Sequence, residues 1–232
     1  EGIATALDLA STIKKVPVLS GVCHGFIANR IMTRRREQAE SLILEGESPQ
    51  SVDQALYDFG FPMGVFAMMD LVGLDVIDRK EPYRTVKQEL VKLDRRGQKV
   101  GAGYFDYDEE RRPTPSAVVD KIISEVAAER GIEQRGNLDR EQLIARLLYP
   151  VVNEGARILE EGIALRASDI DVTCILGYAW PVYTGGPMFW ADTVGLPRIV
   201  SALREMAKKY GPSFEPAQLL VDKAKSGERL SG

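Results

Sequence analysis

Apolar residues recur at intervals of three and four positions along most of the chain, which is the pattern of amphipathic α-helices. In the first such segment the apolar positions are Ile3, Ala6, Leu7, Ala10 and Ile13. The same spacing predicts helices over residues 25–46, 48–59, a segment after Gly64, 118–128 and 140–161. We therefore expect a mainly α-helical protein.

Residues with particular roles at helix ends mark several of these boundaries. Gly46 is placed to end the long helix, because glycine readily adopts the left-handed conformation that terminates helices. Ser48 is expected to cap the next helix through its side chain, with Pro49 at the first helical position. The turn at residues 60–64 then separates this helix from a third one.

Three segments depart from the helical pattern. Residues 16–19, Val-Pro-Val-Leu, predict a short strand, and one strand after one helix cannot form a sheet alone. We therefore interpret residues 1–20 as the edge of an α/β domain. Residues 97–107 are rich in glycine and aromatic residues, and residues 111–115, with two prolines, predict a surface connection.

The sequence contains an internal repeat with its elements in the same order. Leu42–Gly46 corresponds to Ile158–Gly162, Val52-Asp53 to Ile170-Asp171, Gly60-Phe61 to Gly177-Tyr178, and Asp70–Leu74 to Asp192–Leu196. Four ordered matches indicate a duplicated helical unit. We therefore divide the chain into residues 1–20, a first helical domain of residues 21–113, and a second, related domain of residues 114–232.

Composition limits the classes of function. The chain has 232 residues, of which 44% are hydrophobic and 28% charged, and its formal net charge of -4 argues against nucleic acid as a partner. The basic run of residues 34–36 lies in a helical pattern and is interpreted as a solvated or interdomain face. No apolar run is long enough to span a bilayer, and Cys23 and Cys174 lack the spacing of a metal site or a disulfide framework.

The two ends of the sequence carry two further expectations. The chain starts with Glu1 rather than methionine, so we expect it to be part of a longer protein. Its final residues do not form the Ser-Lys-Leu peroxisomal signal, so we expect the bacterial cytoplasm as its location, with the peroxisome as the alternative.

Several motifs resemble those of one enzyme family, in the family's order. They are Gly25–Arg30 (Gly-Phe-Ile-Ala-Asn-Arg), the turn Gly60–Gly64, Asp70–Asp75 and Gly97–Tyr107, followed in the second unit by Asn153–Gly155, Gly177–Pro181 and Thr184–Met188. Together they resemble the C-terminal part of multifunctional 3-hydroxyacyl-CoA dehydrogenases of fatty acid β-oxidation, over nearly the whole chain.

The resemblance implies a fold, a reaction and a cofactor. It implies two tandem helical domains of the 6-phosphogluconate and 3-hydroxyacyl-CoA dehydrogenase C-terminal type, after a short α/β remnant. The parent enzyme would oxidise L-3-hydroxyacyl-CoA with NAD and carry an enoyl-CoA hydratase module as well. The resemblance places the catalytic histidine, its glutamate partner and NAD on a nucleotide-binding domain before residue 1. We therefore expect no catalytic, NAD-binding or metal-binding residue here, and no activity of the chain alone.

Asn29 is the one candidate substrate-binding residue. It matches the substrate-contacting asparagine of the family, and its amide can both donate and accept hydrogen bonds. Alignment of Gly46 with Gly162 places Arg30 opposite Arg146 and Asn29 opposite Ala145, so the second unit lacks the polar group. His24, the sole histidine, is interpreted as a turn residue, because the family's base lies outside this sequence.

The other candidates are interpreted as structural. Residues 61–63 shape a turn, although a place near the acyl or CoA channel stays open. The aromatic residues Tyr178, Trp180, Tyr183, Phe189 and Trp190 are expected to pack between helices. Gly185-Gly186 with Lys208-Lys209 do not form a phosphate loop. The four aspartates that both repeats contain, Asp53, Asp70, Asp171 and Asp192, indicate capping or buried hydrogen bonds.

Two alternative functions remain, together with one expectation about assembly. A non-catalytic helical assembly module would not need Asn29. Another Rossmann-plus-helical dehydrogenase, of the hydroxyacid type, is disfavoured by the duplication. In single-copy members the unit pairs with its twin, so we expect the two units of this chain to form an intramolecular pseudo-dimer. The expected partners are acyl-CoA and the enzyme's own nucleotide-binding domain.

Overall fold

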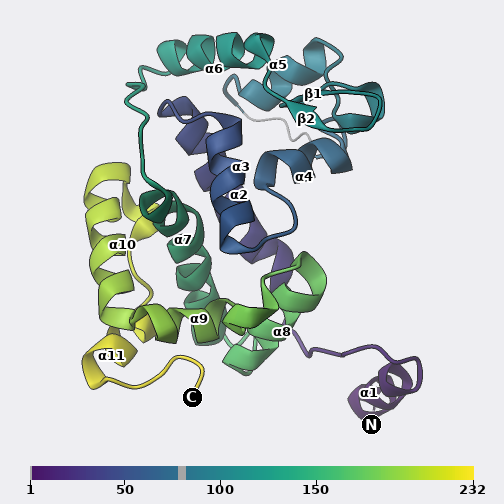
Figure 1. Cartoon of the computed structure of the whole chain (residues 1–232). Coiled ribbons are helices and arrows are strands. Elements are labelled where there is room, and N and C mark those ends of the chain that lie inside the picture. Colours follow the sequence, from purple (N-terminus) through teal and green to yellow (C-terminus); the bar gives the residue numbers. More distant parts are fainter. Residues whose placement is uncertain (1, 78–81) are drawn as a thin grey trace. The chain divides into compact units, whose positions relative to one another are not determined.

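The computed structural model of the chain describes residues 2–77 and 82–232 (Figure 1). Over these residues the chain is mainly helical, as the sequence predicts. The helices are α1 (Gly2–Thr12), α2 (Ala28–Leu44), α3 (Pro49–Phe59), α4 (Val65–Val72), α5 (Val86–Lys92), α6 (Ala117–Glu129), α7 (Arg140–Glu160), α8 (Ala167–Tyr178), α9 (Pro187–Val194), α10 (Leu196–Tyr210) and α11 (Gln218–Ser226). Short 3-10 turns lie at Gln98–Val100, Val182–Thr184 and Pro212–Phe214.

The chain forms two compact units that are not contiguous in sequence. One contains residues 2–31 together with 151–232, and the other contains the described residues of 32–150. The boundaries fall inside α2 and α7, so each unit holds one part of both long helices. The division at residue 113, which follows the repeat and not the contacts, stays a prediction.

The unit of residues 32–150 has a core of aliphatic and aromatic side chains. Its fully buried residues include Leu42, Leu56, Phe66, Leu74 and Leu90. The ring of Phe66 packs against Tyr104, with 4.6 Å between the ring centroids. Beside this core, residues of the expected surface connection form a strand, because β2 (Pro113–Thr114) pairs antiparallel with β1 (Asp106–Tyr107).

The predicted cap of α3 is confirmed. The backbone amide of Ser51 donates to the side-chain oxygen of Ser48 at 3.0 Å, and Pro49 occupies the first helical position. Gly46 has the positive φ of 107° that was expected beyond α2. These boundaries follow from local sequence alone, since each depends on residues at most five positions apart.

The unit of residues 2–31 and 151–232 has its core among α7 to α11. In α10 the buried residues are Leu196, Ile199, Val200 and Leu203, at the spacing of one helix face. Helix α11 and the short turn before it pack on α10. Within α8, Ile170 and Cys174 are also buried.

The paired aspartates have the same structural role in both repeats. The carboxylate of Asp53 accepts bonds from the backbone amides of the second and third residues of α4, at 3.0 and 2.9 Å. Asp171 accepts bonds from the second and third residues of α9, at 2.7 and 3.2 Å. Each carboxylate thus satisfies amides that a helix start leaves without an intrahelical partner. The prediction of a capping role is confirmed for this pair.

The second pair of aspartates is Asp70 and Asp192, and each accepts hydrogen bonds from a segment that comes later in the sequence of the same repeat. Asp70 accepts bonds from the amides of residues 104 and 105 and from the hydroxyl of Tyr107, at 2.8–3.1 Å. Asp192 accepts bonds from the amides of residues 230 and 231 and from the hydroxyl of Ser231, at 2.6–2.9 Å. The prediction of buried hydrogen bonds is confirmed. The two repeats therefore share these hydrogen bonds as well as their sequence pattern.

One part of the proposed repeat alignment is wrong. The residue after α3 is Gly60, with φ of 107°, and the residue after α8 is Ala179, with φ of 52°, so both helices end in the left-handed conformation. Gly177, which the sequence alignment paired with Gly60, lies inside α8. Helix α8 is one residue longer than α3, and this shift makes Trp180 the structural equivalent of Phe61, both of them 3% exposed.

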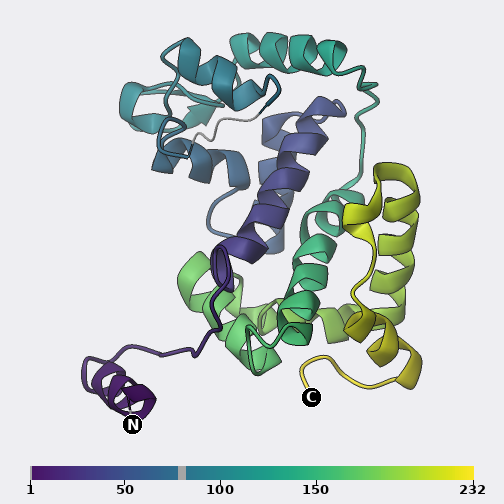
Figure 2. The same cartoon turned by 180° about the vertical axis from the view of Figure 1, so that it is seen from behind.

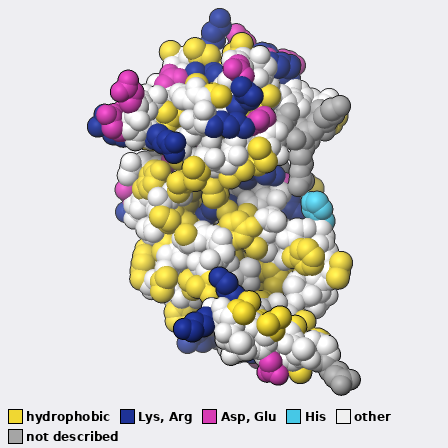
Figure 3. All heavy atoms as spheres, turned by 90° about the vertical axis from the view of Figure 1, so that its right-hand side faces the viewer, with side chains coloured by type: hydrophobic (Ala, Val, Ile, Leu, Met, Phe, Trp, Pro, Cys, Tyr) yellow, Lys and Arg dark blue, Asp and Glu magenta, His cyan; other side chains and the backbone are white. Residues whose placement is uncertain are grey.

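In the N-terminal segment the predicted helix forms and the predicted strand does not, while the interpretation of residues 1–20 as the edge of an α/β domain stays a prediction. Helix α1 forms, but none of its residues is buried, and an extended segment joins it to the rest of its unit (Figures 1 and 2). Residues 16–19 are not a strand, since no neighbouring strand pairs with them among the described residues. Only Ser20 makes an isolated bridge, to Ala164. Exposed apolar side chains are visible on one face in Figure 3, and those of α1 include Ile3, Leu7 and Leu9.

Candidate functional site

Asn29 is the second residue of α2 and is exposed. A tight turn at residues 24–27 precedes the helix, in which Gly25 and Phe26 both have positive φ, of 78° and 49°. A Cβ atom on Gly25 would lie 2.9 Å from the backbone nitrogen of Arg30, so glycine is needed there. The helix begins three residues later than predicted because of this turn. Asn29 nevertheless lies within its first turn, as expected.

The side chain of Asn29 bonds to a residue of the second repeat. The hydroxyl of Tyr178, the last residue of α8, donates a hydrogen bond to Oδ1 of Asn29. Burial raises the pKa of the Tyr178 phenol above its ordinary value of 10.0, so the hydroxyl stays protonated near neutral pH and can donate. The sequence predicts only packing between helices for Tyr178, and it gives no sign of this bond.

An ion-pair network begins at the residue after Asn29. The guanidinium of Arg30 contacts the buried carboxylate of Glu154 at 2.5 Å and that of Glu161 at 2.5 and 2.7 Å. Arg157 lies 3.4 Å from Glu154 on the same helix. The hydrogen bond with Arg30 lowers the pKa of the Glu161 carboxyl, so this pair is ionised at neutral pH. The network holds the first turn of α2 against the second half of α7.

His24 lies in the turn before α2, and its side chain is exposed. This position agrees with the interpretation of His24 as a turn residue, while its lack of a chemical role stays a prediction. The neighbouring Cys23 thiol donates to the backbone oxygen of Phe26 at 3.4 Å, and in the described structure neither Cys23 nor Cys174 belongs to a disulfide. Among residues 2–77 and 82–232 no three side chains of the metal-ligating types gather into a cluster.

The basic run at residues 34–36, for which the sequence predicted a solvated or interdomain face, contains one buried arginine. Arg35 is only 2% exposed, and its guanidinium carbon lies 4.6 Å from the ring centroid of Phe61. Arg34 pairs with Glu37 on the surface of α2. Burial of Arg35, a residue of α2, could not be predicted because Phe61 lies in the turn between α3 and α4. Phe61 therefore has a structural contact, which agrees with the turn-shaping role expected for residues 61–63.

The aromatic residues of the second repeat divide into two groups. Trp180 packs edge-on against Trp190, with 6.0 Å between centroids, and its indole Nε1 donates to the Thr184 hydroxyl at 2.6 Å. Tyr183 and Phe189 are exposed. Packing between helices is thus confirmed for the two tryptophans and wrong for the two exposed rings.

The glycine pair at residues 185–186 does not form a phosphate site, in agreement with the sequence analysis. The carboxylate of Asp171 already occupies the start of α9, where an anion would have to bind. Lys208 pairs with Glu205, and the amine of Lys209 lies 4.7 Å from the ring centroid of Tyr210. A phosphate at this helix start would be repelled by the aspartate.

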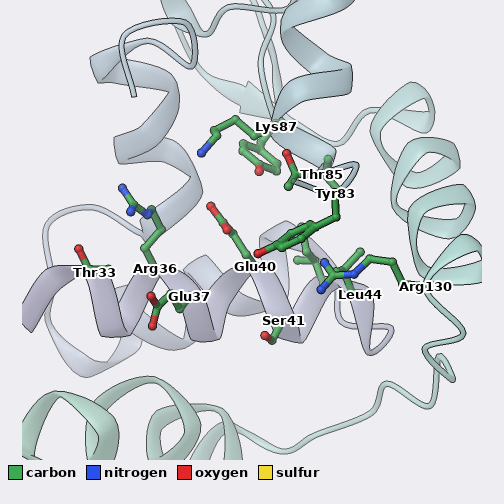
Figure 4. Close-up of a pocket in the computed structure, with 13 residues that line it drawn as sticks. Thr33, Arg36, Glu37, Glu40, Ser41, Leu44, Tyr83, Thr85, Lys87 and Arg130 are labelled. Atoms are coloured by element: carbon green, nitrogen blue, oxygen red, sulfur yellow. The ribbon is translucent and has the colours of Figure 1, made fainter. Parts of the chain in front are cut away.

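A pocket of about 290 Å³ lies within the unit of residues 32–150 (Figure 4). Side chains of α2 line one part of it, and the rest is lined by Tyr83, Thr85, Val86, Lys87, Tyr104 and Arg130. The charged lining residues have both signs: Arg36, Glu37, Glu40, Lys87 and Arg130. Lys87 is only 6% exposed, and the guanidinium of Arg130 lies over the ring of Tyr83. The pocket does not include Asn29, so it is separate from the candidate substrate contact.

A family model matches the chain twice. The model describes the 3-hydroxyacyl-CoA dehydrogenase C-terminal domain, and the matched segments are residues 25–107 and 143–230. One segment lies in each repeat. Together they cover well over half of the chain, and the first includes Asn29 while the second includes Tyr178.

Curated proteins of much greater length are similar to the chain. The peroxisomal bifunctional enzyme of Cavia porcellus is 38% identical over 97% of this chain, which corresponds to 34% of that protein. The glyoxysomal fatty acid beta-oxidation multifunctional protein MFP-a of Cucumis sativus is 35% identical over 99% of the chain and 34% of its own length. The chain therefore spans about a third of the length of these relatives.

Two solved structures resemble the chain over nearly its whole length. The dehydrogenase part of multifunctional enzyme 1 from C. elegans has 32% identity and a TM-score of 0.74, covering 96% of this chain and 53% of that one. The 3-hydroxybutyryl-CoA dehydrogenase from Escherichia coli K12 has 22% identity and a TM-score of 0.75, covering 97% and 65%. The second likeness concerns the fold alone. In the described part of the chain, no helix has the length and apolar character needed to cross a membrane.

Proposed function

We propose that this chain, which belongs to the 3-hydroxyacyl-CoA dehydrogenase C-terminal domain family, forms the substrate side of an L-3-hydroxyacyl-CoA dehydrogenase of fatty acid β-oxidation. The enzyme oxidises the 3-hydroxyl group of the acyl-CoA to a 3-oxo group, with NAD as the hydride acceptor. The double match of the family model, with Asn29 in the first segment, is the observation that carries the proposal.

Asn29 acts as the substrate contact in this proposal. Oxidation of an alcohol needs a hydride acceptor and a base for the hydroxyl proton, both held within bonding distance of the substrate. An amide at the start of α2 can fix a substrate oxygen without itself exchanging a proton. The chain thus contributes orientation, and the base is assigned to a nucleotide-binding domain of the enzyme.

The glycine-rich segment at residues 97–103 does not fit a dinucleotide. Gly97 and Gly103 belong to the most glycine-rich segment, but both are packed against Asp70. A Cβ atom on Gly97 would lie 2.1 Å from the backbone oxygen of Asp70, and one on Gly103 would lie 2.0 Å from its carboxylate. A carboxylate at this place would repel a pyrophosphate group. We therefore assign NAD binding to the nucleotide-binding domain and none to this segment.

The proposal is tested first with the chain by itself. With acetoacetyl-CoA and NADH we expect no turnover, and isothermal calorimetry with NAD should give no heat of specific binding. Turnover by the chain that is abolished by His24→Ala would contradict both the proposed division of roles and the interpretation of His24 as a turn residue.

The second test uses the dehydrogenase that contains this chain and its nucleotide-binding domain. Asn29→Ala should lower kcat for the acyl-CoA by about 100-fold or more, with little change in the affinity for NAD, because a substrate-orienting contact is lost. Ala145→Asn, at the equivalent position of the second repeat, is the matched control and should change neither quantity. Equal and small effects of the two substitutions would favour the alternative function, a non-catalytic helical assembly module.

The relatives' names support two finer parts of the proposal. They describe bifunctional or multifunctional proteins about three times longer than this chain, which supports a second activity, an enoyl-CoA hydratase, in the same enzyme. They also contain the words peroxisomal or glyoxysomal, which favours the peroxisome over the bacterial cytoplasm that we expected from the C-terminal residues.

The two repeats are proposed to form an intramolecular pseudo-dimer. Support comes from the contacts of the long helices, since Arg30 of the first repeat bonds to Glu154 and Glu161 of the second. In the opposite direction, Arg146 of the second repeat bonds to Gln38 and Glu45 of the first. Reciprocal contacts of this kind are typical of interfaces with two-fold symmetry.

A further inference from the structure

We infer that Tyr178 is a positioning residue for Asn29, contributed by the second repeat to the substrate contact of the first. The inference rests on the proposed function, since it concerns the same site. Its basis is the hydrogen bond from the Tyr178 hydroxyl to Oδ1 of Asn29, between residues 149 positions apart in the sequence.

With the Tyr178 hydroxyl as donor, the amide group of Asn29 turns its oxygen toward Tyr178. A tyrosine hydroxyl can donate to the amide oxygen, and the two ends of an asparagine amide differ in that only the oxygen accepts. With Oδ1 turned to Tyr178, Nδ2 is turned away from it. A substrate that meets Asn29 through Nδ2 must therefore present an acceptor atom, such as a carbonyl or hydroxyl oxygen. Loss of the Tyr178 hydroxyl would allow the amide to rotate and offer the wrong end.

The neighbours of Tyr178 restrict the position of its ring. The next residue, Ala179, ends α8 in the left-handed conformation, and the backbone nitrogen of Trp180 then donates to the Cys174 oxygen at 3.1 Å. Trp180 is 3% exposed and is held through its indole by Thr184. The helix end that carries Tyr178 is thus anchored in the core, which a positioning residue requires.

The repeat shows that packing does not require this polar pair. The corrected alignment, in which Ala179 corresponds to Gly60, makes Phe59 the equivalent of Tyr178. Ala145 is the equivalent of Asn29. The reciprocal pair, Ala145 and Phe59, therefore has neither the amide nor the hydroxyl. This is so although α3 and α8 both end in a left-handed residue. The chain has the polar pair at only one of two equivalent places, which is the arrangement expected for a function and not for the fold.

The inference is tested by Tyr178→Phe in the dehydrogenase that contains this chain. The variant keeps the ring, which the reciprocal position tolerates as Phe59, and removes only the hydroxyl. We expect kcat for the acyl-CoA to fall by about 10-fold, with an unchanged KM for NAD, because only substrate orientation is affected. Tyr57→Phe is the control, since it removes a surface hydroxyl from α3, and it should leave kcat unchanged.

A double-mutant cycle separates positioning from a general structural effect. If Tyr178 acts through Asn29, Tyr178→Phe should cause no further loss of kcat in the Asn29→Ala enzyme. The same fractional loss in both backgrounds, or no loss in the unsubstituted enzyme, would overturn the inference. A complete lack of hydroxyacyl-CoA dehydrogenase activity in the unsubstituted enzyme would instead refute the proposed function, so the two failures are distinguishable.

A second measurement does not depend on activity or on the folding of the tyrosine variant. In the chain itself, Asn29→Ala should shift the NMR signals of the Tyr178 ring, whereas Ala145→Asn should not. Unchanged Tyr178 signals in the Asn29→Ala chain would show that the hydrogen bond is not formed in solution, and this result would also overturn the inference.

Discussion

Arg30 and Arg146 occupy equivalent positions in the two repeats and make equivalent contacts in opposite directions. Arg30 bonds to Glu154 in α7 and to Glu161 just after it, and Arg146 bonds to Gln38 in α2 and to Glu45 just after it, the latter two at 2.8 and 2.5 Å. Alignment of Gly46 with Gly162 makes Gln38 the counterpart of Glu154 and Glu45 the counterpart of Glu161. Each arginine lies within one compact unit together with its partners. The repeat is thus preserved in contacts as well as in sequence.

Removal of the Arg146 side chain should strongly destabilise the chain. Arg146 is 4% exposed and bonds to Gln38 and to Glu45, so Arg146→Ala leaves the Glu45 carboxylate without its buried cation. Loss of the cation costs about 1–3 kcal/mol, less than in a fully buried pair because the Glu45 side chain is 24% exposed. Arg112→Ala is the control, because Arg112 also has two acidic partners but its side chain is 71% exposed. Urea denaturation measures both, and similar losses would show that the Arg146 pair is not special.

The corrected alignment of the helix ends predicts opposite changes in the free energy of unfolding for substitutions at Gly60 and at Ala179. Gly60 has a left-handed backbone, so Gly60→Ala should lower the free energy of unfolding by about 1 kcal/mol. Ala179 has the same type of backbone with a Cβ atom, so Ala179→Gly should raise it by up to about 1 kcal/mol. Thermal unfolding of the two variants measures the effects. If Gly177→Ala proved as harmful as Gly60→Ala, the original alignment would be correct after all.

The buried aspartates should make stability depend on pH. Burial raises the pKa of Asp53 to about 7 and that of Asp171 to about 6. An unfolded aspartate ionises near pH 4, so between the two pKa values unfolding releases a proton and stability falls as the pH rises. The stability of the wild-type chain relative to Asp53→Asn should therefore fall between about pH 4 and pH 7, by roughly 4 kcal/mol in all.

Asp171→Asn provides the internal comparison for this pH dependence. The stability of the wild-type chain relative to Asp171→Asn should also fall as the pH rises. It should reach its final value about one pH unit lower than for Asp53, because the pKa of Asp171 is lower. Urea titrations at several pH values measure the differences between each variant and the wild type. If the stability of the wild type relative to Asp53→Asn instead rose with pH, the hydrogen bonds from the backbone amides would outweigh burial and keep the carboxylate ionised.

Features that depend on neighbouring residues in the sequence could be predicted. The long helices follow from apolar spacing, and the start of α3 follows from Ser48 and Pro49, which act within one turn. The structural role of Asp53 and Asp171 was also foreseen, because a residue that both copies share is better explained by the fold than by a site in one copy. Asn29 was found only through the resemblance to a family, since its spacing carries no signal.

Features that depend on distant contacts could not be predicted. The partner of Asn29 is 149 positions away, and an aromatic cluster gives no sign that one hydroxyl differs from the rest. The run that contains Arg35 was interpreted as a solvated or interdomain face, and the burial of Arg35 could not be predicted because its contact with the Phe61 ring comes from another element. The strand expected at residues 16–19 is absent from the described structure, since apolar β-branched residues become a strand only beside a partner.

The chain is expected to be a monomer in solution because the second repeat takes the place that a second copy of the first repeat would otherwise occupy. The contacts of Arg30 and Arg146 join the repeats in both directions within one chain, and a covalent link gives such contacts a high effective concentration. Sedimentation equilibrium at micromolar concentration measures the mass.

Exposed apolar side chains on α1, among them Ile3 and Leu9, provide a separate route to association. Any dimer of the chain should therefore be weak and should disappear when the chain begins at Gly21, since α1 contributes no buried residue to the core. A tight dimer that persists in the shortened chain, and that Arg146→Ala dissociates, would mean that the repeats pair between molecules and would refute the pseudo-dimer.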